Sequence, residues 1–232
     1  RLAGSDLLVA QSHTWRGTIH FHMGRWDEGL AELEMGSKIE SDLPGVFTGL
    51  SLATELMYRA YADPEGARGI IDATRTRLPV PGRPRGWGSW ALALAHAEAH
   101  FVMGNDEEVA ALYPVIRDSI DDGVLFRAFG WLPVEGVAGA AAGLAGDWEQ
   151  AERHFASANE VIDRLGYVYH KPEIQRFEGA FLLRRGGPGD GDRARALLTA
   201  AVDEYRRIGM VKHAEMCEAL LAEAVTGSTL PA

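Results

Sequence analysis

The most informative turn in the sequence reads Gly146-Asp-Trp-Glu-Gln-Ala151, and Phe155 and Ala158 follow it. The glycine ends one helix by adopting a left-handed conformation, and the aspartate caps the start of the next helix. Ala151 lets two helices approach closely, and Phe155 lies four residues later on the same helical face. The segment therefore predicts two antiparallel helices joined by a tight polar turn.

Similar turns recur along the chain, and each is followed by a small residue at the matching position. These small residues are Gly29, Ala67, Val109, Ala151 and Ala194, which lie 38, 42, 42 and 43 residues apart. One helix pair cannot bury its apolar face alone, so such units stack on one another. We expect helix pairs over residues 5–23 with 27–40, 45–61 with 64–77, 86–103 with 106–121, 133–145 with 148–165, and 170–186 with 190–208, and a last helix over 211–225.

The pattern resembles the tetratricopeptide repeat over about residues 5–225. The resemblance implies an all-α, right-handed solenoid of about five antiparallel helix hairpins with a C-terminal capping helix. The repeat of 38–43 residues exceeds the family's usual length of about 34. In this it is similar to the helical regions of large bacterial regulators, such as maltose-regulator-like transcription factors and multidomain ATPase or adenylate cyclase proteins. We interpret residues 1–232 as a single repeat domain of a larger protein, with 226–232 as a frayed tail.

Composition limits the classes of partner. The 232 residues include 23 Lys and Arg against 33 Asp and Glu, a net charge of −10, whereas nucleic-acid binding requires a basic surface. The chain contains no apolar run of about 18 residues and no signal peptide, so we expect a cytoplasmic protein that binds neither nucleic acid nor membrane. The lone cysteine, Cys217, excludes an internal disulfide and a cysteine-rich zinc site.

Two histidine pairs have a spacing that raises the question of a metal site. His96 and His100 share a helix face, but Glu98 lies about 200° around the helix from His96 and cannot act as a metalloprotease base. His20 and His22 point to different sides of their helix, which argues against joint ligation of a metal ion. Both pairs are interpreted as ordinary helix residues, and no metal is expected.

Two other features lack the residues that catalysis or cofactor binding would require. The loop 186–192 is rich in Gly and Asp, but Arg193 and Ala194 stand where a phosphate loop needs Lys and Ser or Thr. Cys217 lies between Glu215 and Glu218, whose charges disfavour a reactive thiolate. We therefore expect a non-catalytic chain without a cofactor, with a repeat turn at 186–192 and a packing residue at Cys217.

Aromatic residues precede three of the predicted first helices. An irregular segment over 123–132 carries Phe126 as well as one of these sets. Equivalent positions in stacked repeats lie side by side, so the sets either form a ladder along a binding groove or pack between repeats. The three sets are Trp87 with Trp90, Phe129 with Trp131, and Tyr167 and Tyr169 with His170.

The resemblance also implies a concave face lined by first-helix residues around the packing glycine. Carried onto this sequence, those positions are Thr18 and Phe21, Leu56 and Arg59, Glu98 and Phe101, and, by position in the helix, Glu173 and Arg176. Arg59 and Arg176 either pair with an anionic ligand or lie on a solvated face. The candidate groove residues are Thr18, Phe21, Arg59, Trp87, Glu98, Phe101, Trp131, His170, Glu173 and Arg176.

A curved stack of helix pairs is suited to recognition. The first hypothesis is a scaffold in a bacterial regulatory protein that binds a protein, a peptide or another domain of the same polypeptide. The alternative is a small-molecule sensor region of a signalling ATPase, adenylate cyclase or transcriptional regulator.

Overall fold

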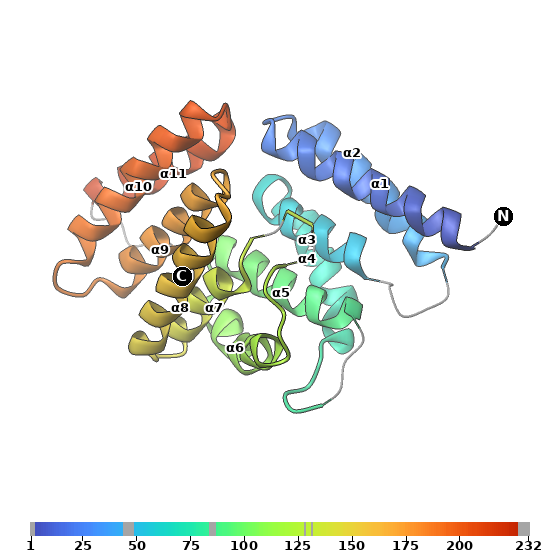
Figure 1. Ribbon diagram of the computed structural model, residues 1–232, viewed down its shortest axis with the longest axis horizontal. Helices are drawn as coiled ribbons and strands as arrows, with labels where there is room; N and C mark the ends of the chain where they lie inside the picture. Colours follow the sequence, from blue (N-terminus) through green and yellow to red (C-terminus); the bar gives the residue numbers. More distant parts are fainter. Residues whose placement is uncertain (1–2, 44–48, 84–86, 128, 131, 227–232) are drawn as a thin grey trace. The chain divides into compact units, whose positions relative to one another are not determined.

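The computed structural model describes residues 3–43, 49–83, 87–127, 129–130 and 132–226 (Figure 1). Within these ranges the chain forms eleven α-helices and one short 3-10 helix, and no β-strand. The prediction of an all-α fold is therefore confirmed for the described residues. The chain divides into two compact units, Arg1–Trp131 and Leu132–Ala232, which are described separately.

Unit 1 consists of helices that pack against their neighbours in sequence. The first helix of each pair also contacts the first helix of the following pair, α1 with α3 and α3 with α5. The pairs are α1 (Ala3–His22) with α2 (Trp26–Ser41), α3 (Leu50–Ala62) with α4 (Pro64–Thr74), and α5 (Trp87–Val102) with α6 (Asp106–Asp121); η1 (Arg75–Arg77) follows α4.

Unit 2 repeats this arrangement and ends in an additional helix. Its helices are α7 (Val134–Leu144), α8 (Trp148–Leu165), α9 (His170–Arg185), α10 (Asp190–Arg207) and α11 (Val211–Thr226). The pairs are α7 with α8 and α9 with α10, while α11 packs on α10. In both units the helices occupy nearly the ranges expected from the sequence.

The largest difference in a helix boundary is at α3, which begins at Leu50 instead of residue 45. The buried carboxylate of Glu40 accepts hydrogen bonds from the backbone N–H groups of Gly49, Leu50 and Ser51. These are the donors that a helix start leaves without intrahelical partners. The cap therefore comes from the preceding helix, ten residues before Leu50.

Four of the five turns between paired helices contain a left-handed glycine, but a side chain caps the second helix at only two of the five. Gly146 has φ +87°, and the Asp147 carboxylate accepts a hydrogen bond from the N–H of Gln150 at 3.1 Å. Asp63 caps α4 in the same way through the N–H of Gly66 at 3.0 Å. The capping prediction is wrong at the other three turns, where Arg25, Asn105 and Gly189 precede α2, α6 and α10 without such a side-chain cap.

Close contact at glycines brings paired helices together. A Cβ atom added to Gly139 of α7 would lie 2.9 Å from the Phe155 ring of α8. The same addition at Gly17 would lie 2.6 Å from Leu33, and at Gly179 it would lie 2.8 Å from Leu198. These separations are shorter than a normal carbon–carbon contact. The helices of each pair can therefore pack this closely only because glycine, which has no Cβ atom, stands at these positions.

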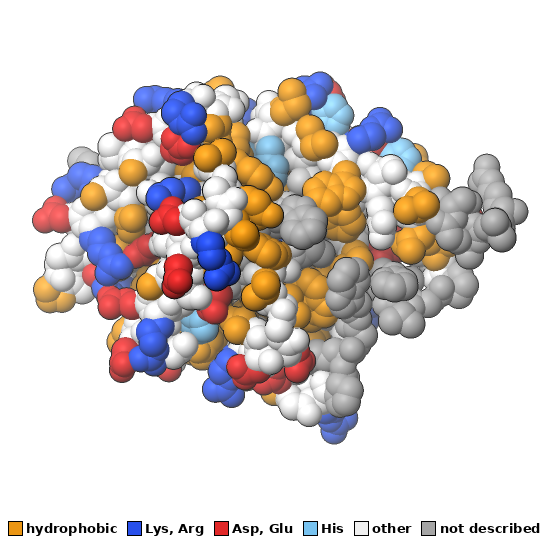
Figure 2. All heavy atoms as spheres, viewed as in Figure 1, with side chains coloured by type: hydrophobic (Ala, Val, Ile, Leu, Met, Phe, Trp, Pro, Cys, Tyr) orange, Lys and Arg blue, Asp and Glu red, His pale blue; other side chains and the backbone are white. Residues whose placement is uncertain are grey.

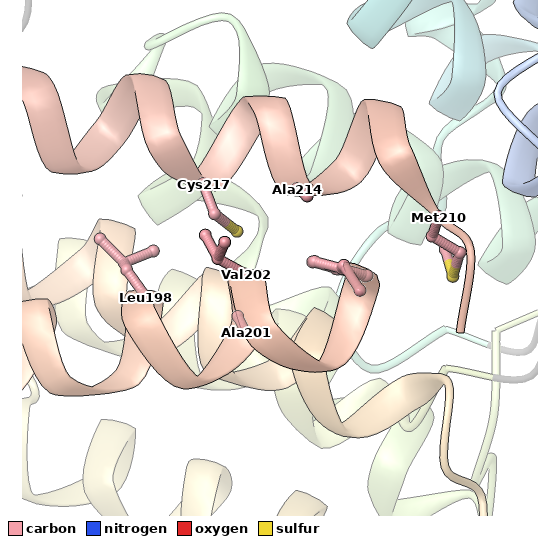
Figure 3. Close-up of a cluster of buried hydrophobic side chains, with 7 residues drawn as sticks. Leu198, Ala201, Val202, Met210, Ala214 and Cys217 are labelled. Atoms are coloured by element: carbon pink, nitrogen blue, oxygen red, sulfur yellow. The ribbon is translucent and has the colours of Figure 1, made fainter. Parts of the chain in front are cut away.

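The C-terminal helix buries an apolar face on α10. Figure 3 shows Ala214 and Cys217 of α11 facing Val202 and Leu198 of α10, with Met210 at the start of the helix. The cluster is completed by Ala201 and Tyr205, and Cys217 is fully buried. This packing agrees with the interpretation of Cys217 as a core residue.

We predict that Gly139→Ala destabilises the protein, because the added methyl group would overlap the Phe155 ring. Overpacking of this kind lowers the free energy of unfolding by about 1–3 kcal/mol. The matched control is Gly69→Ala in α4, where an added Cβ meets nothing within 4 Å. That substitution is expected to raise the free energy of unfolding by about 0.5–1 kcal/mol by restricting the unfolded chain. Urea unfolding measures both, and equal effects would contradict the packing argument.

Candidate functional site

The segment after α6 turns back over the first helices of unit 1. Gly123 has φ +86°, and its N–H and that of Val124 donate to the carbonyls of Ile120 and Ser119. This paired arrangement is the Schellman motif, which ends a helix at a left-handed glycine. We call residues 122–130 the connector; Figure 1 draws it in yellow-green after α6.

A pocket of about 520 Å³ lies between the connector and helices α1, α3 and α5. A cavity of this size holds a drug-sized molecule. Its wall is mainly apolar and includes four aromatic side chains. The lining residues are Gln11, Trp15, Leu50, Trp90, Asp122, Gly123, Val124, Leu125, Phe126, Arg127 and Phe129.

Two aromatic rings join the connector to α1. The rings of Trp15 and Phe129 lie 5.1 Å apart at 74°, the edge-to-face geometry that aromatic pairs favour. Phe129 has φ +43°, and it is the only residue other than glycine with positive φ in the described part of the chain. A left-handed backbone at such a residue costs about 1–2 kcal/mol, so surrounding contacts hold the connector in place.

A buried ion pair anchors the connector to α5. The Arg127 guanidinium donates to the Glu98 carboxylate, and their side chains are 2% and 1% exposed. Tyr61 of α3 donates to the same carboxylate at 3.1 Å, and the Met57 sulfur lies 3.5 Å from Arg127 Nη1. Removing one partner of such a pair leaves an uncompensated buried charge, at a cost of about 3–5 kcal/mol.

The candidate groove residues of unit 1 are mostly buried. Thr18 and Phe101 are 2% and 3% exposed, and the Phe21 ring stacks on Trp26 with centroids 4.8 Å apart. The Arg59 guanidinium forms ion pairs with the carboxylates of Glu34, Glu55 and Asp63. Of these candidates, Glu98 contacts a pocket-lining residue, and the ligand contacts inferred from the resemblance stay predictions.

Unit 2 brings Glu173 and Arg176 together under α10. Tyr205 donates to Glu173 Oε1 at 2.7 Å, and Arg176 Nη2 lies 3.4 Å from the same oxygen. Burial, with the nearby Glu173 charge, raises the pKa of Tyr205 well above its usual value. His170 is 1% exposed and its ring lies 3.8 Å from that of Tyr169. These three candidate residues thus lie in the core of the unit.

The structure places the three predicted sets of aromatic residues in different surroundings. Trp90 and Phe129 line the same pocket, as members of two predicted sets. Trp131 and the side chain of Trp87 lie outside the described residues. Tyr167 and Tyr169 lie beside His170 in unit 2, and the ladder remains a prediction.

Trp15, Gln11 and Arg127 line the pocket but were not among the residues predicted from the sequence. Arg127 is the one basic residue in the apolar run from Val124 to Trp131, and this was the available signal. Trp15 and Gln11 carry no comparable signal, because their position depends on where the connector lies.

His96 and His100 share a buried helix face, with ring centroids 5.9 Å apart. Thr74 Oγ1 donates to the Ile70 carbonyl and lies 2.8 Å from His96 Nε2, which suits a neutral ring that donates from Nε2. Burial, together with the charges of His100 and Arg75, lowers the pKa of His96 to about 4. Within the described residues, no group of three or more His, Cys, Asp or Glu side chains is arranged to hold a metal ion.

The turn at 186–192 is closed by its own side chains. The Asp190 carboxylate accepts hydrogen bonds from Arg185 and from the N–H of Gly187, and the bond from Arg185 lowers its pKa. The turn thus joins α9 to α10 as expected for a repeat. None of the described helices combines the length and the apolar character needed to cross a membrane.

Comparisons with protein-family models, with curated proteins and with solved structures found no significant match to this chain.

We predict that His96 makes the fold sensitive to acid. Below about pH 6.5 the unfolded chain takes up a proton at this residue, whereas the folded chain does so only near pH 4. The free energy of unfolding should fall across this range by up to about 3 kcal/mol from His96 alone. Urea unfolding from neutral pH to pH 4 measures the loss. His96→Gln should lose less stability over the same range, and an identical loss would refute the assignment.

We also predict that Cys217 is unreactive in the folded protein, because it is fully buried and burial raises its pKa to about 12. Only the thiolate is alkylated, so iodoacetamide should modify this residue in urea but not under native conditions at mildly alkaline pH. Intact-mass measurement follows the reaction. Rapid native modification would mean that α11 opens from α10.

Proposed function

We propose that the chain is a non-catalytic recognition module that binds a small, largely apolar molecule in the pocket of unit 1. The observation that carries the proposal is the pocket of about 520 Å³ with Trp15, Trp90, Phe126 and Phe129 in its wall. Binding sites for small molecules are typically concave and mostly apolar, with a few polar groups that fix orientation. Gln11, Asp122 and Arg127 are the polar groups here.

The connector favours a small ligand over a long peptide in this unit. It lies on the face formed by α1, α3 and α5, where a solenoid of this type would bind an extended segment. The buried pair of Arg127 and Glu98 holds it there. The space between the connector and these helices is the pocket of about 520 Å³.

We propose further that the helix pairs form a right-handed, tetratricopeptide-like solenoid of about five hairpins with α11 as its cap. The recurring turns and the glycine contacts within pairs support this assignment. As a part of a larger cytoplasmic regulator, the chain would act as the small-molecule sensor. A signalling ATPase, an adenylate cyclase or a transcription factor would then supply the output.

A second candidate function is a protein-interaction scaffold. The observation that favours it is a row of exposed apolar side chains on α1 and on the residue that directly follows it. Figure 2 shows side chains of this apolar type in orange. Spacings of seven and four residues place them on one side of the helix. They are Leu8, Trp15, Ile19 and Met23, with exposed fractions of 65%, 38%, 53% and 58%.

We predict that the neutral dye Nile red binds unit 1 with a stoichiometry of one and that Trp15→Ala weakens this binding about tenfold. Loss of the indole removes one pocket wall, and an aromatic contact of this size contributes on the order of 1 kcal/mol or more. Fluorescence titration gives the Kd and the stoichiometry.

The matched control is Trp148→Ala, which changes a comparably exposed tryptophan outside the pocket; Trp15 is 38% exposed and Trp148 is 44% exposed. This variant should bind the dye as the unaltered chain does. A ligand of the pocket at 100 times its Kd should also raise the Tm by about 5–10 °C. Equal dye affinity in the two variants would contradict the proposal.

A further inference from the structure

The connector contacts all three first helices of unit 1 with side chains of distinct chemistry. Phe129 contacts Trp15 of α1, while Arg127 reaches Met57 of α3 and Glu98 of α5. Phe126 lines the adjoining pocket. The chain thus carries an arginine with an aromatic residue on each side, seated across a face built by helices from distant parts of the sequence.

We propose that Glu98 and Tyr61 form a recognition site for an arginine in an extended peptide of a partner protein, and that the connector occupies this site in the free protein. The partner segment would carry an aromatic residue on each side of its arginine, as the connector does. This proposal concerns a site beneath the connector and goes beyond small-molecule binding in the adjoining pocket.

The chemistry of the site selects for a guanidinium group. The Glu98 carboxylate is 1% exposed, and a buried carboxylate requires a cation with directed hydrogen bonds. Tyr61 donates to Oε1 and thereby orients the carboxylate, while Arg127 binds Oε2. A planar guanidinium with five fixed donors fits such a buried acceptor better than the compact, strongly hydrated ammonium of lysine.

The backbone of the connector makes exchange for another segment feasible. Phe129 adopts φ +43°, and Gly130 follows with φ +88°. A Cβ atom on Gly130 would lie 3.2 Å from the Tyr58 hydroxyl and 3.5 Å from Arg127 Nη2. The connector therefore bears conformational strain at Phe129 that a peptide without these constraints would avoid. Because Phe126, Arg127 and Phe129 also line the pocket, displacement of the connector would remove one wall of the pocket.

The test uses a fluorescein-labelled peptide with the sequence of residues 122–131 and the full chain, with fluorescence anisotropy as the measurement. Arg127→Gln withdraws the chain's own guanidinium, so this variant should bind the peptide at least tenfold more tightly than the unaltered chain. A peptide with glutamine in place of its arginine should not show the gain. Arg127→Lys keeps a cation opposite Glu98, so the buried charge stays compensated and the variant should remain folded. Its affinity for the peptide should lie between those of the unaltered chain and Arg127→Gln.

Two further variants separate recognition from a general loosening of the structure. Arg68→Gln removes an exposed arginine of α4, whose partner is Glu65, and should bind the peptide as the unaltered chain does. Adding Glu98→Gln to Arg127→Gln removes the negative charge that pairs with the guanidinium and should abolish the gain. The proposal is overturned if Arg127→Gln and Arg127→Lys bind no more tightly than Arg68→Gln, or if the glutamine peptide binds equally well.

Discussion

The distance between paired helices is the constraint on which the rest of the structure depends. Gly17, Gly139 and Gly179 each face a large side chain of the partner helix at separations that leave no room for a Cβ atom. Close approach buries the opposing Leu33, Phe155 and Leu198 almost completely. Because every buried contact gains dispersion and hydrophobic energy, these few positions set the packing of the helix pairs.

Packing of the first helices against one another then builds the face on which the connector lies. That face contains Glu98, which would be a costly buried charge without Arg127. The ion pair and the Trp15–Phe129 contact hold the connector against helices α5 and α1. The pocket forms between the connector and helices α1, α3 and α5. The proposed ligand site and the proposed arginine site therefore both depend on one segment, the connector over residues 122–130.

Much of the fold was predictable because its signals are local. The turn chemistry at Gly146 and Asp147 and the small residue at Ala151 act within a few residues, and the helices begin and end near the expected positions. The start of α3 was misplaced, because its cap is the side chain of Glu40 in the preceding helix. The candidate groove was harder to predict, since first-helix positions such as Thr18 and Glu173 lie in the core instead of on an open face.

The amino-acid sequence alone determined an all-helical chain, the ranges of its helices and the pairs they form, since capping and helical periodicity operate over three or four residues. The tertiary structure alone decided where the connector lies and what the pocket contains. Arg127 is 29 residues from Glu98 and 70 from Met57, and no local pattern encodes contacts between such distant positions. Those contacts exist only once the helix pairs have stacked and desolvated Glu98, which is why a residue expected on a binding face became the anchor of the chain's own segment.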